Sequence, residues 1–195
     1  MIEKLNIVFD VDDTLWPLNE MACRLCGIDY NKIEDFKLYK NTKLTEEEQG
    51  ALWDLYQDPT LWQYMKYVKG AMDIHTLISD DVDVWLVSNC INERVSNYKR
   101  SVLSRDLLIP DNRIILNVTD KAGGKGKVLP ANTFIFVDDS PYNLVESTAE
   151  YDLIPAKRWN RNYRKANAYR FNDFEQLIAF IRVLIKDKAG EHMRG

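Results

Sequence analysis

The chain has 195 residues, of which 46% are hydrophobic and 29% are charged. This is an ordinary globular composition, long enough for one domain with a well-buried core and a modest insertion. The net charge of −4 argues against a nucleic-acid polymer or an anionic membrane as the main partner, but not against small phosphorylated ligands.

A cytoplasmic location is expected. The first residues, MIEKLNIVFD, contain no apolar core of signal-peptide length, and no stretch approaches the length of about 18 apolar residues that a membrane span needs. The chain has three cysteines, an odd number that fits a reducing compartment. Cys23 and Cys26 form a single CxxC on one expected helix face, where packing is favoured over zinc or redox chemistry.

The first predicted element is a strand over residues 5–9, an apolar run typical of a strand buried on both faces. It leads directly into the stretch FDVDDTLW, which holds Asp10, Asp12 and Asp13. Crowded carboxylates at a strand end repel one another and lose hydration, a cost that a divalent cation would offset. A simple turn is the plainer alternative. A calcium loop is excluded, because Leu15 stands where an EF-hand needs Gly and Met21 where it needs Glu.

Residues 15–70 have a helical pattern. A helix is predicted over residues 17–26, ending at Gly27. Thr45 and Glu48 form a capping-box pattern that opens a second helix reaching Asp58. Since nothing in this segment resembles a parallel-sheet strand, we expect a small helical cap inserted after the first strand.

From residue 71 onward, strands alternate with helices. The predicted elements are a helix at 71–79, a strand at 82–87, a helix at 91–105, strands at 113–116 and 133–137, a helix at 141–148, a strand at 151–154 and a helix at 173–187. This alternation predicts an α/β fold with a doubly wound, mostly parallel, Rossmann-like sheet. The expected organisation is a core of residues 1–14 and 71–190, the cap of residues 15–70 and a tail at 191–195.

Four polar features follow predicted strands, and the carboxyl ends of parallel strands meet at one edge of a sheet. They are the pair Asp10 and Asp12, then Ser88, then a lysine between 121 and 127, and finally the pair Asp138 and Asp139. Singly, a serine there is often a helix cap, and a lysine among glycines is often solvated. Together they supply a nucleophile, cation ligands, phosphate donors and a proton shuttle, which is what phosphoryl transfer requires.

These motifs resemble those of the haloacid dehalogenase-like (HAD) phosphatases, whose pattern is DxDx[TV], a Ser or Thr after a hydrophobic strand, a Lys and a late acidic pair. They stand here as DVDDT (10–14), VWLVS (84–88), a lysine in DKAGGKGK (120–127) and FVDDS (136–140). The order and spacing fit along most of the chain, and the first and fourth motifs are specific as a pair.

The resemblance implies roles for the acidic residues. Asp10 would be the nucleophile that forms an aspartyl-phosphate, and Asp12 the general acid and base. Mg²⁺ would be held by the carboxylates of Asp10 and Asp138 and by the backbone carbonyl of Asp12, with Asp139 on a metal-bound water.

The resemblance also implies phosphate contacts. Ser88 and the backbone N–H of Asn89 would bind phosphate oxygens, together with the lysine. Spacing favours Lys127 or Lys121, and Lys125 lies between them, so the choice stays open. The sequence GGKGK is not a P-loop, because no Gly stands five residues before either Gly-Lys pair.

Within that superfamily, the cap position and the stretch from RIILN through KVLPANTFIFVDDSP are similar to the 5'(3')-deoxyribonucleotidase (cytosolic 5'-nucleotidase type C) family. Asp13-Thr14 replaces the Gly-Val common there, which leaves the substrate open. A nucleoside monophosphate is the substrate implied. Trp16 and Trp62 could stack against its base, although packing within the cap is the plainer role.

Three alternatives remain. One is a HAD phosphatase for another small ester, such as a sugar phosphate, and another is a metal- or phosphate-binding protein without turnover. The third, a phospho-receiver domain, would be shorter and uncapped, with an Asp where Ser88 stands. The expected partner is a small phosphorylated substrate, and the oligomeric state is left open, with a homodimer among the options.

Overall fold

The computed structural model describes residues 4–35, 41–119 and 124–192. Within these residues, six parallel strands form one sheet in the order β3-β2-β1-β4-β5-β6. The strands are β1 (Leu5–Asp10), β2 (Val82–Cys90), β3 (Ile114–Val118), β4 (Thr133–Val137), β5 (Tyr151–Pro155) and β6 (Ala168–Phe171). The predicted doubly wound parallel sheet is therefore confirmed.

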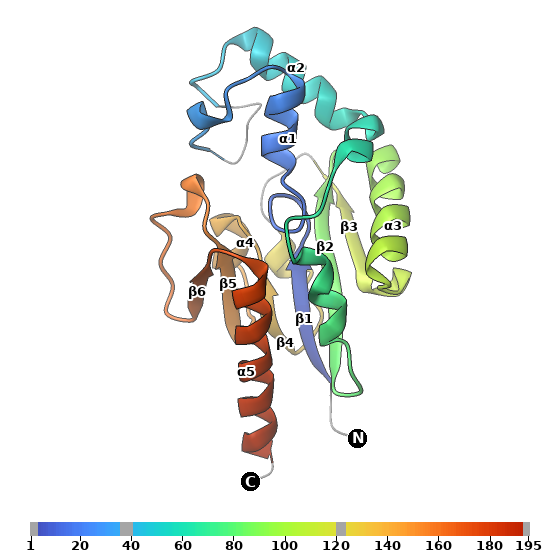
Figure 1. Ribbon diagram of the computed structural model, residues 1–195, viewed down its shortest axis with the longest axis vertical. Helices are drawn as coiled ribbons and strands as arrows, with labels where there is room; N and C mark the ends of the chain where they lie inside the picture. Colours follow the sequence, from blue (N-terminus) through green and yellow to red (C-terminus); the bar gives the residue numbers. More distant parts are fainter. Residues whose placement is uncertain (1–3, 36–40, 120–123, 193–195) are drawn as a thin grey trace.

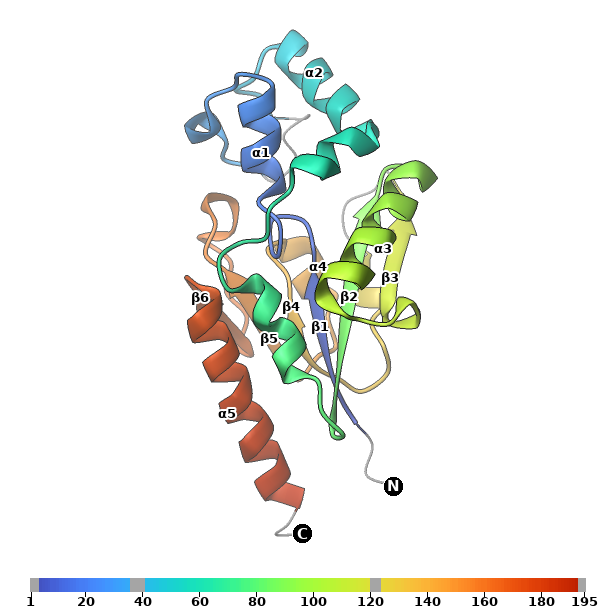
Figure 2. The ribbon, with the colours of Figure 1, turned by 45° about the vertical axis from the view of Figure 1, so that its right-hand side comes forward.

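Helices cover both faces of the sheet (Figures 1 and 2). The α-helices are α1 (Leu18–Leu25), α2 (Glu46–Gln57), α3 (Glu93–Leu107), α4 (Pro141–Val145) and α5 (Phe174–His192). The 3₁₀ segments are η1 (Tyr30–Lys32), η3 (Pro59–Tyr64), η4 (Ala71–Leu77), η5 (Asp111–Arg113), η6 (Lys125–Lys127) and η7 (Arg158–Asn160). No helix among the described residues is long and apolar enough to span a membrane.

The central strands bury both of their faces, because successive side chains of a strand point to opposite sides. Ile7 and Ile135 pack in the larger core cluster, which includes residues of α3, η4 and α5. Val8 and Phe136 pack in the smaller cluster, which includes Leu144 of α4. The two clusters hold β1 and β4 rigidly between layers, which fixes the positions of their carboxyl ends.

The strand order contains a switch point beside β1. The chain builds the sheet outward from β1 through β2 to β3, and then returns to the other side of β1 with β4. In open α/β sheets, ligands bind at the carboxyl ends of the strands where the order reverses. This point lies between the end of β1 and the end of β4.

Residues 15–35 and 41–70 form a helical layer over the carboxyl edge of the sheet, here called the helical insert (Figures 1 and 2). The predicted capping box is present at the start of α2: the Thr45 side chain accepts from the Glu48 N–H at 3.2 Å, and the Glu48 side chain accepts from the Thr45 N–H at 2.8 Å. The insert leaves the core near Leu15 and returns near Val68, whose N–H donates to the Leu15 carbonyl at 2.8 Å.

Several element predictions differ from the structure. The helix predicted at 141–148 ends at Val145, and the strand predicted at 82–87 continues to Cys90, so that Ser88 lies within β2. The strand β6 was not predicted, because the two middle residues of its AYRF sequence are exposed and leave no apolar alternation. The segment that follows the insert is the 3₁₀ helix η4 rather than an α-helix. Helix α5 continues to His192, past the predicted start of the tail at residue 191.

Candidate active site

The loop after β1 is held by its own backbone. The N–H groups of Leu15 and Trp16 both donate to the Val11 carbonyl, at 2.8 and 2.9 Å. Asp13 adopts a positive φ of 59°, a conformation that Asp tolerates better than most residues. Its carboxylate turns toward helix α1 and accepts the Asn19 N–H at 2.9 Å. Of the three acids in this loop, Asp13 therefore serves the start of α1.

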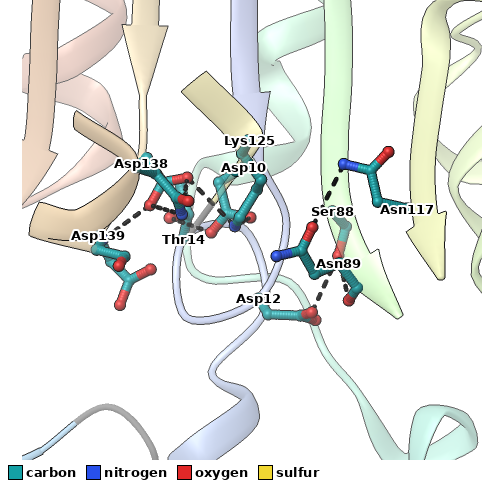
Figure 3. Close-up of polar contacts among 12 residues, drawn as sticks. Asp10, Asp12, Thr14, Ser88, Asn89, Asn117, Lys125, Asp138 and Asp139 are labelled. Atoms are coloured by element: carbon teal, nitrogen blue, oxygen red, sulfur yellow. Dashed lines mark hydrogen bonds and ion pairs between the residues drawn. The ribbon is translucent and has the colours of Figure 1, made fainter. Parts of the chain in front are cut away.

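Asp10 lies in a buried carboxylate cluster with Asp138 and Asp139, as Figure 3 shows. Each residue can offer one oxygen atom such that the three lie within 4.8 Å of one another. Asp10 ends β1, and the two other residues follow β4, so the cluster occupies the switch point of the sheet. The sequence motifs at 10–14 and 136–140 thus meet in space.

Lys125 is the lysine that the structure brings to this cluster. Its ammonium group forms ion pairs with Asp10 and, at 3.2 Å, with Asp138, and its side chain is 9% exposed. Lys127, which the spacing favoured, is 71% exposed and pairs with Glu146 at 3.0 Å. Of these two lysines, Lys125 and not Lys127 therefore contacts the carboxylate cluster. Lys121 lies outside the described residues.

Neighbouring donors orient each carboxylate. The Thr14 hydroxyl donates to Asp10 at 3.1 Å. The amide group of Asn143 donates to both oxygens of Asp138, at 3.1 and 3.0 Å. The indole N–H of Trp159 donates to Asp139 at 2.7 Å. Sequence reasoning missed Asn143 and Trp159, and neither belongs to a motif that would have revealed it.

The cluster carries more negative charge than its one lysine balances. Burial raises the pKa of Asp10 to about 7, and the charges of Asp138 and Asp12 add to that rise while Lys125 opposes it. Burial also raises the pKa of Asp139 well above its usual value. For Lys125, burial opposes the charged form, but Asp10 and Asp138 more than offset it and raise its pKa.

These residues fit a divalent cation. Three buried carboxylates share one ammonium group, so a further positive charge would relieve their repulsion. Carboxylate oxygens are the hard ligands that Mg²⁺ prefers. Burial and the neighbouring carboxylates also raise the pKa values of Asp10 and Asp139, which reflects the same crowding of negative charge.

A second polar group lies beside the cluster and contains Asp12, Ser88 and Lys99 (Figure 3 shows the first two). The Ser88 hydroxyl donates to Asp12 at 3.0 Å, and the Lys99 ammonium donates to Ser88 at 2.9 Å and also contacts Asp12. Ser88 does not cap helix α3. That role belongs to Asn92, whose side chain accepts the Val95 N–H at 2.9 Å.

Sequence reasoning missed Lys99, which is fully buried. It lies on the inward face of α3 in a series with a spacing of four, formed by Val95, Lys99, Leu103 and Leu107, all of them buried. A lysine within an otherwise apolar helical stripe is the signal that could have identified it.

The two tryptophans predicted to contact substrate lie in the core. Trp16 is 1% exposed and Trp62 is 4% exposed, and their ring centroids are 6.0 Å apart. Tyr67 packs on Trp16 at 5.7 Å. With their surfaces covered in this way, the rings are not available to stack a base, and packing is the role that the structure shows.

The helical insert contacts the core on two sides of the site. The Arg158 guanidinium donates to the Tyr30 carbonyl at 2.9 Å and to the Asn31 side chain at 2.7 Å. The Asn92 amide donates to the Gln57 carbonyl at 3.0 Å. The insert therefore sits directly over the carboxyl ends of the strands.

Comparison with known proteins identifies the fold. No family model matches the chain, and no curated protein matches it in sequence. Several solved structures match, among them a haloacid dehalogenase-like family hydrolase from Xanthomonas campestris, with a TM-score of 0.58 and 16% identity over 98% of this chain and 100% of that one.

Two further matches have the same character. A HAD-superfamily hydrolase, subfamily IA, from Geobacter sulfurreducens has a TM-score of 0.54 and 13% identity over 91% of this chain and 96% of that one. YfnB from Bacillus subtilis, described as a HAD-hydrolase bound to magnesium, has a TM-score of 0.54 and 14% identity over 92% of this chain and 99% of that one. At these identities, the likeness shows that the chain has the fold of HAD-like hydrolases.

Proposed function

We propose that the protein is a Mg²⁺-dependent phosphomonoesterase that works through an aspartyl-phosphate on Asp10. The observation that carries the proposal is the buried cluster of Asp10, Asp138 and Asp139 with Lys125 against it, at the switch point of the sheet. The shared fold with HAD-like hydrolases supports it, as does the magnesium described for YfnB.

In this proposal, the carboxylates of Asp10 and Asp138 and the backbone carbonyl of Asp12 would hold Mg²⁺, with Asp139 acting on it through water. When bound, the cation supplies positive charge against the carboxylates and the phosphate, so that an anionic ester can approach an anionic nucleophile. The donors from Asn143 to Asp138 and from Trp159 to Asp139 keep these ligands oriented.

The first chemical step is a transfer to the enzyme. A carboxylate oxygen of Asp10 attacks the phosphorus atom, and the bond from phosphorus to the ester oxygen breaks. Asp12, in its protonated form, gives its proton to the departing oxygen, so that an alcohol leaves. Lys125 and the Asn89 N–H hold the oxygens of the phosphoryl group during this step, together with the Ser88 hydroxyl, which turns from Asp12 to the phosphate when the ester binds and leaves Asp12 to Lys99.

The second step releases phosphate. Asp12, now a carboxylate, takes a proton from a water molecule whose oxygen attacks the phosphorus atom of the aspartyl-phosphate. The bond from phosphorus to the Asp10 oxygen breaks, which regenerates the Asp10 carboxylate and leaves inorganic phosphate. The helical insert acts in this proposal as a cap that limits access of bulk water to the intermediate.

For the substrate, we propose a nucleoside monophosphate. The resemblance of the RIILN to FVDDSP region to the deoxyribonucleotidases supports this assignment, as does the position of the insert over the strand ends. The burial of Trp16 and Trp62 removes the stacking contacts expected from the sequence, so base recognition would fall to other residues of the insert. Tyr64 of η3, with 56% of its surface exposed, is an aromatic residue open to such contact.

The test is phosphate release from a panel of ribonucleoside and deoxyribonucleoside monophosphates and sugar phosphates, each with Mg²⁺ and with EDTA. We expect Mg²⁺-dependent release, fastest with deoxynucleotides, and a loss of at least about a thousandfold in Asp10→Asn. Release from sugar phosphates alone would keep the mechanism and overturn the substrate. An intact protein that releases nothing while binding Mg²⁺ and phosphate would overturn the enzymatic function.

A further inference from the structure

Lys99 is the second buried lysine of the site, and its burial requires compensation. Its side chain lies on α3 with 1% of its surface exposed. Removing an ammonium group from water is strongly unfavourable unless nearby groups pair with it. An apolar residue could fill the same volume without the cost in folding free energy of burying a charge. The contacts of the Lys99 ammonium group therefore indicate its role.

The contacts of Lys99 gather around Asp12, the proposed acid-base residue. Its ammonium group forms an ion pair with the Oδ2 atom of Asp12 and donates to the Ser88 hydroxyl at 2.9 Å. It also lies 3.5 Å from the Asn89 carbonyl and 4.1 Å from the ring centroid of Trp62 in the helical insert. Lys99 thus connects Asp12 to the core strand β2 and to the insert at once.

The two buried lysines divide the carboxylates between them. Lys125 pairs with Asp10 and Asp138, the proposed nucleophile and one metal ligand. Lys99 pairs with Asp12. This division matches the two tasks of the proposed mechanism, namely attack on phosphorus and movement of a proton.

The two oxygens of Asp12 differ in their surroundings. Oδ2 receives both the Lys99 ammonium and the Ser88 hydroxyl. Oδ1 is buried and has no hydrogen-bond partner among the described residues. Since Oδ2 is held, the orientation of Oδ1 is held as well, and Oδ1 is the oxygen left to exchange a proton with a ligand.

We infer that Lys99 is a positioning residue, which holds Asp12 by Oδ2 so that Oδ1 faces the oxygen that leaves the phosphate ester. The inference rests on the proposed function, because it assigns Lys99 to the acid-base residue of that mechanism. Through Trp62, the same ammonium group also sets the position of Asp12 relative to the helical insert.

The leaving group of the substrate distinguishes this role from a purely structural one. An alkyl phosphate releases an alkoxide, which needs a proton from Asp12. Nitrophenolate is a stable anion and leaves without one. A defect in the position of Asp12 therefore slows hydrolysis of an alkyl ester more than that of p-nitrophenyl phosphate, whereas general damage to the fold slows both equally.

The experiment compares kcat/KM of the wild-type protein and of Lys99→Met with p-nitrophenyl phosphate and with the best alkyl phosphate from the substrate panel, at saturating Mg²⁺. We expect the alkyl ester to lose about 10- to 100-fold more than the nitrophenyl ester, in line with the contribution of general acid catalysis. The exposed Lys186 of α5 supplies the control Lys186→Met, which removes the same charge and should change neither rate.

A double variant tests whether Lys99 acts through Asp12. If it does, Asp12→Asn alone loses more kcat/KM on the alkyl ester than on the nitrophenyl ester. Adding Lys99→Met to Asp12→Asn then changes this difference by no more than about twofold. The inference would be overturned if the losses of the two single variants added in the double variant. It would also be overturned if Lys99→Met lost equal activity on both substrates.

Failure of the fold and failure of the proposed function remain separable. Thermal melting and the retained nitrophenyl activity report on folding, and Lys99→Gln, which keeps a hydrogen-bond donor, takes the place of Lys99→Met in the same assays if the latter does not fold. A wild-type protein that hydrolyses neither ester would overturn the proposed function. A wild-type protein that hydrolyses both, with no leaving-group effect in the variants, would overturn only the role of Lys99.

Discussion

Two lysines separated by one residue have opposite environments in this site. Lys125 and Lys127 both belong to η6, but the first points into the carboxylate cluster and the second points to solvent, where it pairs with Glu146. An exposed ion pair contributes little to stability, because water solvates both charges. Removing a buried ammonium group leaves its two carboxylates unpaired where water cannot solvate them, which is strongly unfavourable. The difference in burial between the two side chains therefore predicts a large effect on activity for substitution of Lys125 and a small one for the same substitution of Lys127.

We expect Lys125→Met to lower kcat by about 100-fold or more, because it removes the positive charge nearest to the proposed nucleophile. Lys127→Met should stay within about threefold of the wild type, since an exposed pair contributes little. Steady-state phosphate release measures both. Equal effects of the two substitutions would contradict the assignment of Lys125.

Asp13 offers a pH-dependent test of stability. Burial raises its pKa to about 7, although Lys157 and the Asn19 N–H oppose the rise. The folded protein therefore keeps a proton on Asp13 between about pH 4 and 7 that the unfolded chain has released. Since the folded state binds more protons in this window, the free energy of unfolding falls as the pH rises through it.

We expect Asp13→Asn to reduce that fall by an amount on the order of 2 kcal/mol between pH 4.5 and 7.5. An asparagine keeps the acceptor for the Asn19 N–H and tolerates the positive φ of this position. Urea unfolding at several pH values, with EDTA present, measures the difference. Parallel pH profiles for the two proteins would contradict the raised pKa.

At the scale of elements, η6 is placed by its contact with α4. A Cβ atom at Gly126 would lie 2.6 Å from the Asn143 carbonyl oxygen and 2.8 Å from the backbone of Glu146. Backbone atoms of α4 have little freedom to move aside, since Leu144 anchors this helix in the core. The close approach of η6 to α4 is what brings Lys125 to Asp10 and Asp138.

Gly126→Ala should therefore push η6 outward, at a cost of about 1–3 kcal/mol in stability, and lower activity by displacing Lys125. The matched control is Gly50→Ala in α2, where nothing lies within 4 Å of the added atom. That control should raise stability by about 0.5–1 kcal/mol, because alanine favours a helix interior. Chemical denaturation and phosphate release measure both variants, and a neutral Gly126→Ala would contradict the packing argument.

At the scale of the whole molecule, the sheet places the first and fourth motifs side by side. Asp10 and Asp138 are far apart in the chain, but Asp10 ends β1 and Asp138 directly follows the neighbouring strand β4. A cation bound between them would therefore need β1 and β4 side by side, as they lie in the folded state. Ligand binding to the folded state alone stabilises it by mass action.

We expect Mg²⁺ at about a hundredfold excess over its dissociation constant to add about 2.7 kcal/mol to the stability of the protein. For a chain of this size, that corresponds to a rise in Tm of roughly 5–10 °C, reversed by EDTA. Asp138→Asn, which removes one proposed ligand, should abolish the response while leaving the protein folded. A Tm that is insensitive to Mg²⁺ in the wild type would contradict the proposed metal site.

Most of the fold could be predicted from local patterns. The strand at 133–137 and the helix opened by Thr45 agree with the structure, because burial on both faces and a capping box leave clear local signatures. The edge strand β6 leaves no such signature, since half of it faces solvent. It forms because β5 offers an open edge, which is a property of the sheet and not of the segment.

The α/β class, the helical insert and the acidic motifs at strand ends could be predicted from the amino-acid sequence, since all of these follow from the order of neighbouring residues. Three features become visible only in the folded chain: Lys125 faces Asp10, 115 positions away, Lys99 reaches Asp12, and Trp16 and Trp62 are buried. The physical reason is that ion pairing and burial depend on which side chains, distant in the sequence, pack against one another and exclude water. Such neighbours arise from the packing of α3, η6 and the insert around β1.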